Sequence, residues 1–159
     1  MDLGFYKNKK VFITGHTGFK GAWLSFLLAE AGAEVTGYAL NPPTVPSLYK
    51  LCKLEERMHS VIGDVRDYKK LKTVFDEVMP DVVFHLAAQP LVRESYISPR
   101  ETYETNVMGT VNILECIRNS DSVKSVIIVT TDKVYRNDNR PEGYVEEDFL
   151  NGYDPYSNS

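Results

Sequence analysis

Apolar residues follow two alternating patterns along the chain. Short runs rich in β-branched residues are typical of buried strands, and segments with apolar residues at helical spacing separate them. The expected strands are one that ends at Gly15 and residues 34–40, 60–67, 81–86 and 125–130, the third ending in a polar turn. The expected helices are residues 22–31, 68–79 and 100–119, and a helix that starts near Tyr156. This alternation predicts an α/β fold: a parallel, doubly wound sheet in which the third, second, first, fourth and fifth strands are neighbours in that order.

Two stretches between these elements follow neither pattern. Residues 41–49 are too rich in proline for a helix or a strand, and we expect an ordered loop. Residues 91–98 have no clear period and are expected to form a loop on the ligand side of the sheet. Arg93, Ser95 and Tyr96 in this stretch could contact phosphate groups of a ligand, or could be ordinary surface residues.

Three glycines follow the first strand at spacings of three residues: Gly15, Gly18 and Gly21. The first lets the chain leave the strand, the second lets a ligand approach the backbone, and the third lets the helix pack against the strand. The helix that follows offers unpaired N–H groups to an anion such as a pyrophosphate. A turn that merely joins a strand to a helix would also explain these glycines. In a doubly wound sheet the ligand lies across the carboxyl ends of the first and fourth strands, and residues 87–89 and 130–133 emerge on the same edge.

The length, net charge and cysteines of the chain narrow the class of protein that it can be. A chain of 159 residues is about one domain long and can bury a core. Its net charge of −4 argues against a nucleic-acid partner. No apolar run approaches the roughly 20 residues of a membrane span, and the N-terminus lacks the apolar core of a signal peptide, so we expect a cytoplasmic protein without membrane contact. Cys52 and Cys116, and the three histidines, lack the spacing of a disulfide framework or a metal site, so no metal is expected.

Thr14 and the three glycines form the pattern TGxxGxxG, which resembles that of the extended short-chain dehydrogenase/reductases, a group that includes enzymes acting on nucleotide sugars. The resemblance implies a Rossmann-type NAD-binding domain over residues 1–159, with the C-terminal nucleotide-sugar-binding domain absent from this chain. The cofactor-binding residues that it implies are Gly15, Thr17, Gly18, Phe19, Lys20, Gly21, Asp64, Val65, Leu86, Ala87, Ala88, Gln89, Asn106, Thr130 and Tyr156.

Some of these assignments have ordinary alternatives. The resemblance implies that Asp64 and Val65 hold the edge and face of adenine, although Asp64 could instead cap a turn or a helix. It implies that Asn106 steadies the active-site water and backbone, although exposed asparagines are common on helices. The second strand ends in Leu40-Asn41, with neither the acid that binds the NAD ribose nor an arginine for NADP. The choice between NAD and NADP therefore stays open at this position, where Asn41 or the backbone could bind the ribose.

The catalytic residues implied by the resemblance are Thr131, Asp132, Lys133 and Tyr156. From spacing alone, a polar loop with an Asp/Lys ion pair is an equal alternative. In the family the tyrosine belongs to a Y-x-x-x-K pair whose lysine lowers the pKa of the phenol. That lysine is expected directly after Ser159, so the chain is expected to be a fragment. The Thr-Asp-Lys sequence and the proline-rich loop resemble the CDP-glucose 4,6-dehydratases more than relatives that carry Thr-Asp-Glu.

This subgroup implies a reaction and its partners. CDP-glucose would lose water across C5 and C6 after transient transfer of its C4 hydride to NAD. Tyr156 would take the C4 hydroxyl proton with the help of Thr131, Lys133 the C5 proton, and Asp132 would protonate the departing hydroxyl. Relatives commonly form homodimers through the helix from Arg100 and the helix near Tyr156, and they usually feed deoxysugars into bacterial surface polysaccharides such as the lipopolysaccharide O-antigen. The alternatives are a dehydratase or epimerase for a dTDP-, GDP- or UDP-sugar, and a non-catalytic NAD(P)-sensing module.

Overall fold

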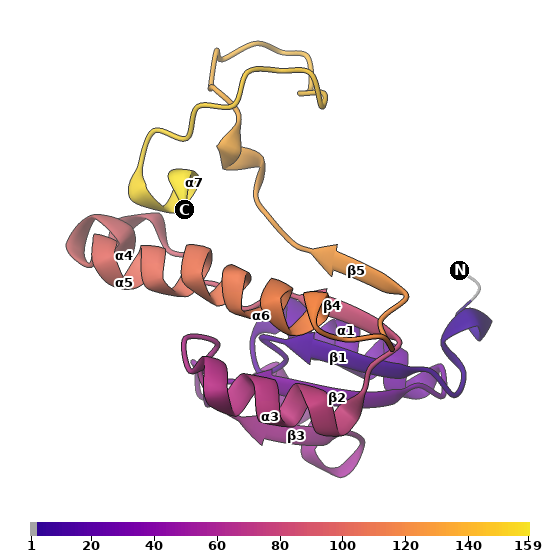
Figure 1. Ribbon diagram of the computed structural model, residues 1–159. Helices are drawn as coiled ribbons and strands as arrows, with labels where there is room; N and C mark the ends of the chain where they lie inside the picture. Colours follow the sequence, from indigo (N-terminus) through magenta and orange to yellow (C-terminus); the bar gives the residue numbers. More distant parts are fainter. Residues whose placement is uncertain (1–2) are drawn as a thin grey trace.

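The computed structural model describes residues 3–159, and its centre is a parallel sheet of five strands in the order β3-β2-β1-β4-β5 (Figure 1). The strands are β1 Lys10–Thr14, β2 Glu34–Ala39, β3 His59–Ile62, β4 Val82–His85 and β5 Ser125–Ile128. The expected order is confirmed. Thr14 pairs with Tyr38 on one side and His85 on the other, and His85 pairs with Ile128, so the carboxyl ends of four strands are level.

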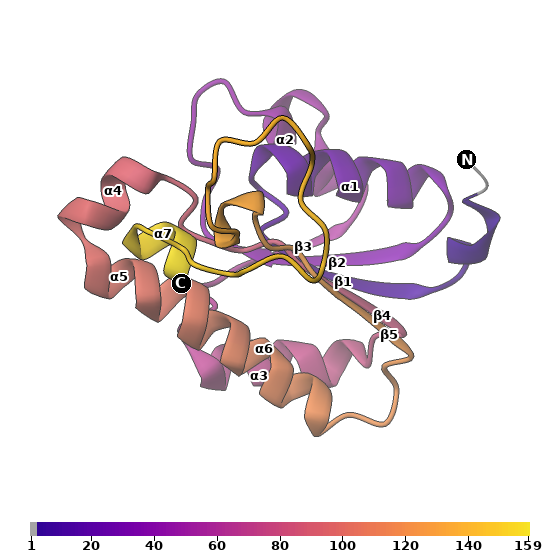
Figure 2. The same ribbon diagram turned by 90° about the horizontal axis from the view of Figure 1, so that it is seen from above.

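Helices cover both faces of the sheet and extend past one edge. The helices α1 Phe19–Glu30 and α2 Leu48–Leu51 lie on one face, and α3 Tyr68–Val78 and α6 Gly109–Arg118 on the other (Figure 2). Beyond the carboxyl ends of the strands, α4 Val92–Ile97, α5 Pro99–Tyr103 and α7 Pro155–Asn158 contact one another. Short 3₁₀ turns occupy Gly4–Tyr6, Leu54–Glu56 and Asp132–Val134. Among the described residues, no helix combines the length and the apolar character needed to cross a bilayer.

The core has one layer on each face of the sheet. On the α3 and α6 face the buried residues include Phe12, Tyr38, Leu71, Phe75, Val83 and Ile113. On the α1 face they include Val11, Ile13, Leu28, Val35, Val82 and Phe84. Neighbouring residues of β1 thus face opposite layers, as the alternation of side chains along a strand requires. All four residues of β4 are buried, as expected for a strand covered on both faces.

Several element boundaries differ from those expected. The first helix begins three residues early, at Phe19, because Gly18 already takes the N-cap position. The third strand ends at Ile62, and Gly63 starts the turn by donating its N–H to Ala39. The proline-rich loop ends before Tyr49, since Ser47 caps α2 by accepting the Lys50 N–H. Local caps, rather than apolar periodicity, set these boundaries.

Residues 91–98 do not form the expected loop. Most of them form α4, which ends at Ile97 and is followed at once by α5, with Pro99 in its first turn. Ser95 is fully buried, and its hydroxyl donates to the Val92 carbonyl oxygen at 2.7 Å. A six-residue helix has too few turns to show a period, and it is held by its contacts with α5 and α7.

The long helix expected over residues 100–119 is confirmed in extent but is not uniform. It runs from Pro99 to Arg118, and its middle, Glu104–Met108, is a π-helical turn. Such turns occur mostly as single insertions within α-helices and often at functional sites. Here Asn106 lies at the centre of the turn.

Candidate active site

In the glycine turn, residues 15–21, backbone atoms crowd Gly15 and Gly21, whereas there is free space beside Gly18. Gly15 has a φ of 78°, and a Cβ there would lie 2.8 Å from the Ala87 amide nitrogen. At Gly21 a Cβ would lie 2.1 Å from the Gly15 carbonyl oxygen, so the first turn of α1 packs directly against the backbone of the glycine turn. At Gly18 a Cβ would meet only that same oxygen, at 3.4 Å. A ligand can therefore approach the backbone at Gly18.

The first turn of α1 suits an anion. Gly18 is its N-cap, and within residues 3–159 no side chain caps this helix. Its first N–H groups are therefore available to an external acceptor. Phe19 and Lys20 are exposed beside them. These features fit the pyrophosphate of a dinucleotide. The resemblance implies that the residues of this turn bind the cofactor: Gly15, Thr17, Gly18, Phe19, Lys20 and Gly21.

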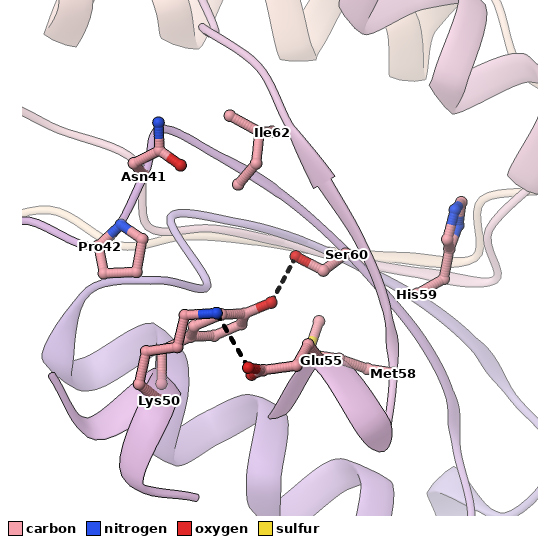
Figure 3. Close-up of a pocket in the computed structure, with 9 residues that line it drawn as sticks. Asn41, Pro42, Lys50, Glu55, Met58, His59, Ser60 and Ile62 are labelled. Atoms are coloured by element: carbon pink, nitrogen blue, oxygen red, sulfur yellow. Dashed lines mark hydrogen bonds and ion pairs between the residues drawn. The ribbon is translucent and has the colours of Figure 1, made fainter. Parts of the chain in front are cut away.

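The end of β2 meets the glycine turn through Thr17, whose hydroxyl donates to the Leu40 carbonyl oxygen at 2.8 Å. The Leu40 side chain is 58% exposed, and Asn41 is exposed beside it. From Asn41 a hollow of about 380 Å³ runs along β3 as far as His59 (Figure 3). The hollow lies beside the predicted ribose position, not at Tyr156.

Beneath this hollow, a buried cluster joins the glycine turn to β3 and α2. His16 Nε2 and the Tyr49 hydroxyl both lie within hydrogen-bond distance of Ser60 Oγ, at 2.7 and 2.8 Å. The two rings meet edge to face, with 5.5 Å between centroids. Burial lowers the pKa of His16 to about 4, against the opposing effect of a hydrogen bond with the Tyr38 backbone. His16 is therefore neutral at physiological pH.

Asp64 accepts hydrogen bonds within its own turn, as the alternative to adenine binding suggested. Its Oδ1 accepts the Arg66 N–H at 2.9 Å, and the Arg66 guanidinium binds both carboxylate oxygens, with Nη2 to Oδ2 at 2.6 Å. This hydrogen-bonded guanidinium lowers the pKa of Asp64. The helix cap is Asp67, which accepts the Lys70 N–H. Asp64 is therefore ionised and held in one orientation, beside the buried Val65.

Asn106 is not an ordinary exposed helix residue. Its Oδ1 accepts the Gln89 N–H at 2.7 Å, and its Nδ2 donates to the Gln89 carbonyl oxygen at 3.2 Å. The same amide nitrogen donates to Ser159 Oγ at 2.8 Å. Asn106 thus holds the backbone that follows β4 and connects it to the end of α7.

The segment after β5 brings Thr131, Asp132 and Lys133 to the same edge. The Thr131 hydroxyl donates to Asp132 Oδ1 at 3.2 Å, and Thr131 Oγ1 accepts the Lys133 N–H at 3.3 Å. Among the described residues neither Asp132 nor Lys133 forms an ion pair, so the expected alternative of an Asp/Lys pair is wrong. Both side chains are exposed. The burial that a neutral Lys133 would need is not provided by residues 3–159.

Tyr156 lies in the first turn of α7, where a helix was expected. Asp154 caps α7 by accepting the N–H groups of Tyr156 and Ser157, each at 3.0 Å. The Tyr103 hydroxyl donates to Asn158 Oδ1 at 2.8 Å and links α7 to the long helix. α7 also contacts the turn at Asp132–Val134. The structure therefore brings Tyr156 and the Thr-Asp-Lys sequence to one region, close to Gln89.

The sequence reasoning gave no site role to three residues of this edge: Thr14, His85 and Thr110. They form a buried hydrogen-bonded series between β1, β4 and α6. A sequence signal existed, because Thr14 and His85 are polar residues at the ends of two apolar strands. Thr110 follows Asn106 by four residues and so shares its helix face. The described residues contain no group of three or more His, Cys, Asp or Glu placed to hold a metal ion, and both cysteines are free.

The two buried histidines predict a pH-dependent stability. Burial lowers the pKa of His85 to about 4, as it does for His16, so both accept protons more readily in the unfolded chain. Their contribution is complete above about pH 6.5 and is lost as the pH falls toward about 4. We expect the free energy of unfolding to fall by about 2 kcal/mol for each histidine between about pH 7.5 and pH 5.

Urea denaturation of the complete protein at these pH values measures this loss. His85→Gln should flatten the dependence, and His59→Gln, at an exposed histidine, serves as the control. An equally steep dependence in His85→Gln would show that His85 does not contribute.

Comparison with known proteins places the chain in a family. A family model described as GDP-mannose 4,6 dehydratase matches residues 12–159. The chain is 54% identical over its whole length to a CDP-glucose 4,6-dehydratase of Salmonella typhimurium, of which it covers 44%. Among solved structures, the epimerase Mth375 of Methanothermobacter thermautotrophicus has a TM-score of 0.81 and 27% identity, with 98% of this chain and 45% of that chain covered.

A UDP-glucose 4-epimerase from Brucella ovis, solved in complex with NAD, has a TM-score of 0.78 and 26% identity, covering 96% of this chain and 44% of its own. The chain thus spans less than half the length of each of these relatives. Their similarity extends over the glycine turn, the five strands and the segment with Thr131 and Tyr156, because nearly all of this chain is aligned in each case. The chain therefore belongs to the family described as GDP-mannose 4,6 dehydratase.

Proposed function

We propose that the chain is the cofactor-binding part of an NAD-dependent CDP-glucose 4,6-dehydratase. The observation that carries this proposal is the contact of the Thr-Asp-Lys turn with the helix that contains Tyr156, at the carboxyl edge of the sheet. The 54% identity to the Salmonella enzyme of that name supports it. Because the chain covers 44% of that relative, a second domain that binds the nucleotide sugar is proposed for the complete protein.

The cofactor proposed for this site is NAD. Gly15, Gly18 and Gly21 would cradle its pyrophosphate at the start of α1, and a relative of known structure was solved with NAD. Asp64 and Val65 would hold the adenine, with Asp64 oriented by Arg66. The remaining proposed contacts, on the nicotinamide side, are Leu86, Ala87, Ala88, Gln89, Asn106, Thr130 and Tyr156. The end of β2 has neither the acid typical of NAD sites nor an arginine for a 2′-phosphate, so the choice of NAD rests on the relative solved with NAD.

The chemistry assigns one task to each side chain. Bound NAD would supply the hydride acceptor for C4 of the sugar and the later hydride donor to C6, while the side chains of this chain handle the protons. Tyr156 removes the C4 hydroxyl proton with the help of Thr131. The resulting ketone acidifies the C5 proton, which Lys133 removes. Asp132, oriented by the Thr131 hydroxyl, protonates the departing C6 hydroxyl. Lys133 is exposed, so this role requires that the bound sugar or the second domain cover it.

The reaction is tested by a panel of sugar nucleotides. The complete protein with NAD should convert CDP-glucose to CDP-4-keto-6-deoxyglucose and should act at least about 100-fold less efficiently on the dTDP-, GDP- and UDP-sugars, a difference of about 2.7 kcal/mol. Mass spectrometry detects the loss of one water. Preference for another sugar nucleotide would show that CDP-glucose is not the substrate. NAD binding without turnover of any sugar would favour a sensing module.

Asp132→Asn tests the acid. It should slow the loss of water by about 100-fold while the oxidation at C4 still proceeds, because an amide cannot donate the proton that the C6 hydroxyl needs. Rapid-quench analysis should then detect a 4-keto hexose nucleotide that has kept its water. Asp138→Asn, in the exposed loop that follows, is the control. A variant that fails already at the C4 oxidation would contradict the role given to Asp132.

The complete protein is proposed to be a cytoplasmic homodimer. A row of partly exposed apolar side chains runs along α5, the π-helical turn and α6, with exposures of 37 to 50%: Tyr103, Val107, Met108, Val111 and Leu114. Such a row on one helix face suits a second copy related by two-fold symmetry. Its deoxysugar product is proposed to enter a surface polysaccharide, as in the O-antigen.

Val111→Glu tests the dimer. A two-fold axis places the new carboxylate on both subunits, so the dimer dissociation constant should rise by at least about tenfold, or about 1.4 kcal/mol. Light scattering coupled to gel filtration measures the mass, and Val145→Glu, at another half-exposed valine, is the control. An unchanged dimer would exclude this helix face as the interface.

A further inference from the structure

A continuous series of hydrogen bonds crosses the sheet edge beneath the proposed nicotinamide side. Thr14 Oγ1 lies 2.7 Å from His85 Nδ1, and His85 Nε2 lies 3.0 Å from Thr110 Oγ1. The Thr110 hydroxyl then donates to the Asn106 carbonyl oxygen at 2.6 Å. Thr14 is fully buried and His85 is 2% exposed, so their hydrogen bond is shielded from water, while Thr110 is half-buried.

The neighbouring contacts fix the direction of every proton in the series. Thr14 Oγ1 already accepts the N–H groups of Leu86 and Ala87, at 3.1 and 3.2 Å, so its own proton is donated to His85 Nδ1. The histidine proton must then be on Nε2, which donates to Thr110. Thr110 Oγ1 accepts this proton and donates its own to the Asn106 carbonyl oxygen. All three residues therefore have one consistent arrangement.

A protonated His85 would break this arrangement. A proton on Nδ1 would point at a hydroxyl whose acceptor sites are taken by two backbone N–H groups. Burial also lowers the pKa of His85 to about 4. The imidazole is thus neutral, with one tautomer, over the physiological range.

The series ends on the π-helical turn, so it affects the orientation of Asn106 as well as the packing of the core. In a π-helical turn the regular i to i−4 hydrogen bonds are interrupted. The Thr110 hydroxyl supplies a donor to the Asn106 carbonyl at this point. The side chain of the same Asn106 holds both backbone groups of Gln89 and the Ser159 hydroxyl. The orientation of Asn106 therefore links β1 and β4 to the segment that contains Tyr156.

We infer that His85, hydrogen-bonded between Thr14 and Thr110, is a positioning residue that fixes the π-helical turn and, through Asn106, the backbone of Gln89 and the helix containing Tyr156. The inference deepens the proposed function, because it rests on Gln89 and Tyr156 being on the nicotinamide side of the site. His85 does not itself touch the substrate; it acts on the reaction through Asn106.

Thr110→Val in the complete protein is the direct test, because valine keeps the volume and removes both hydrogen bonds. Amide hydrogen exchange of Gln89 should accelerate by at least about tenfold, the change that corresponds to about 1.4 kcal/mol of lost protection. Thr73→Val is the matched control, since the Thr73 hydroxyl also donates to a carbonyl four residues earlier, on the exposed side of α3. Unchanged exchange at Gln89 in Thr110→Val would overturn the inference.

Cofactor binding and kinetics provide the second readout. Thr110→Val should weaken NAD about tenfold and leave ADP-ribose, which lacks nicotinamide, within about twofold, because only the nicotinamide side depends on Gln89. The kcat should fall about tenfold or more, with KM for CDP-glucose within about twofold. His85→Gln keeps a donor toward Thr110, so it should retain more of the kcat of the unaltered protein than His85→Leu. Equal weakening of NAD and ADP-ribose would overturn the inference.

The two proposals fail in different ways. If the unaltered complete protein binds NAD but does not dehydrate CDP-glucose, the proposed function is wrong, while exchange at Gln89 and the comparison of NAD with ADP-ribose still decide the role of His85. If it turns CDP-glucose over and Thr110→Val leaves exchange and kcat unchanged, the inference is wrong and the proposed function stands.

Discussion

Replacing Tyr156 by phenylalanine in the complete protein should lower the turnover of CDP-glucose by about 10³-fold and leave NAD bound. The phenol is the proposed base for the C4 hydroxyl proton, and loss of a positioned acid or base typically costs 10²–10⁴-fold. The fold should be kept, because α7 is held by Asp154 at its N-terminus and by Tyr103 through Asn158, and neither contact uses the Tyr156 hydroxyl. Steady-state kinetics and NAD titration measure the two effects.

Tyr153→Phe is the matched control for this experiment. Tyr153 lies three residues earlier and is 94% exposed, so loss of its hydroxyl should leave turnover within about twofold. Unchanged turnover in Tyr156→Phe would remove Tyr156 as the base. Equal losses in the two variants would point to a disturbed segment rather than to a lost base.

Gly21→Ala should be the most destabilising single change in the glycine turn. Its Cβ would lie 2.1 Å from the Gly15 carbonyl oxygen and 2.7 Å from the carbonyl carbon, and both are backbone atoms that cannot move aside freely. Overpacking of this kind typically costs 1–3 kcal/mol. We expect the free energy of unfolding to fall by about 3 kcal/mol. Urea denaturation of the complete protein measures the loss.

Gly18→Ala separates folding from binding at the same turn. A Cβ there meets only the Gly15 oxygen at 3.4 Å, an ordinary contact, so stability should fall by less than about 1 kcal/mol. The added methyl group would occupy the space proposed for the pyrophosphate, and NAD affinity should fall at least about tenfold. If Gly18→Ala binds NAD normally, the cofactor does not approach the backbone at this glycine.

The sheet was predictable because its signals are local and strong. Buried parallel strands are nearly continuous apolar runs, and their alternation with helices, together with right-handed crossovers, favours the doubly wound order that the structure has. Element ends were less predictable. Gly18 is the N-cap of α1 without a side-chain hydrogen bond, and Ser47 caps α2 through one contact, so a period of several residues cannot resolve either boundary.

The hydrogen bonds that connect the candidate site residues could not be predicted from the sequence. Asn106 was singled out by resemblance, but its contact with Gln89 depends on a π-helical turn, for which the sequence carries no periodic signal. α4 was missed because its stability comes from α5 and α7. The series from Thr14 to Thr110 joins residues far apart in the chain, which only the register of β1 with β4 brings together.

The most direct test of the account uses CDP-glucose with deuterium at C4 as the substrate of the complete protein. We expect a 4-keto-6-deoxy product that has lost one water and contains the deuterium at C6, because the hydride removed with the help of Tyr156 returns to the same sugar. Nuclear magnetic resonance of the product locates the label. A product that has kept its water, or one whose C6 lacks the label, would contradict the proposed dehydratase.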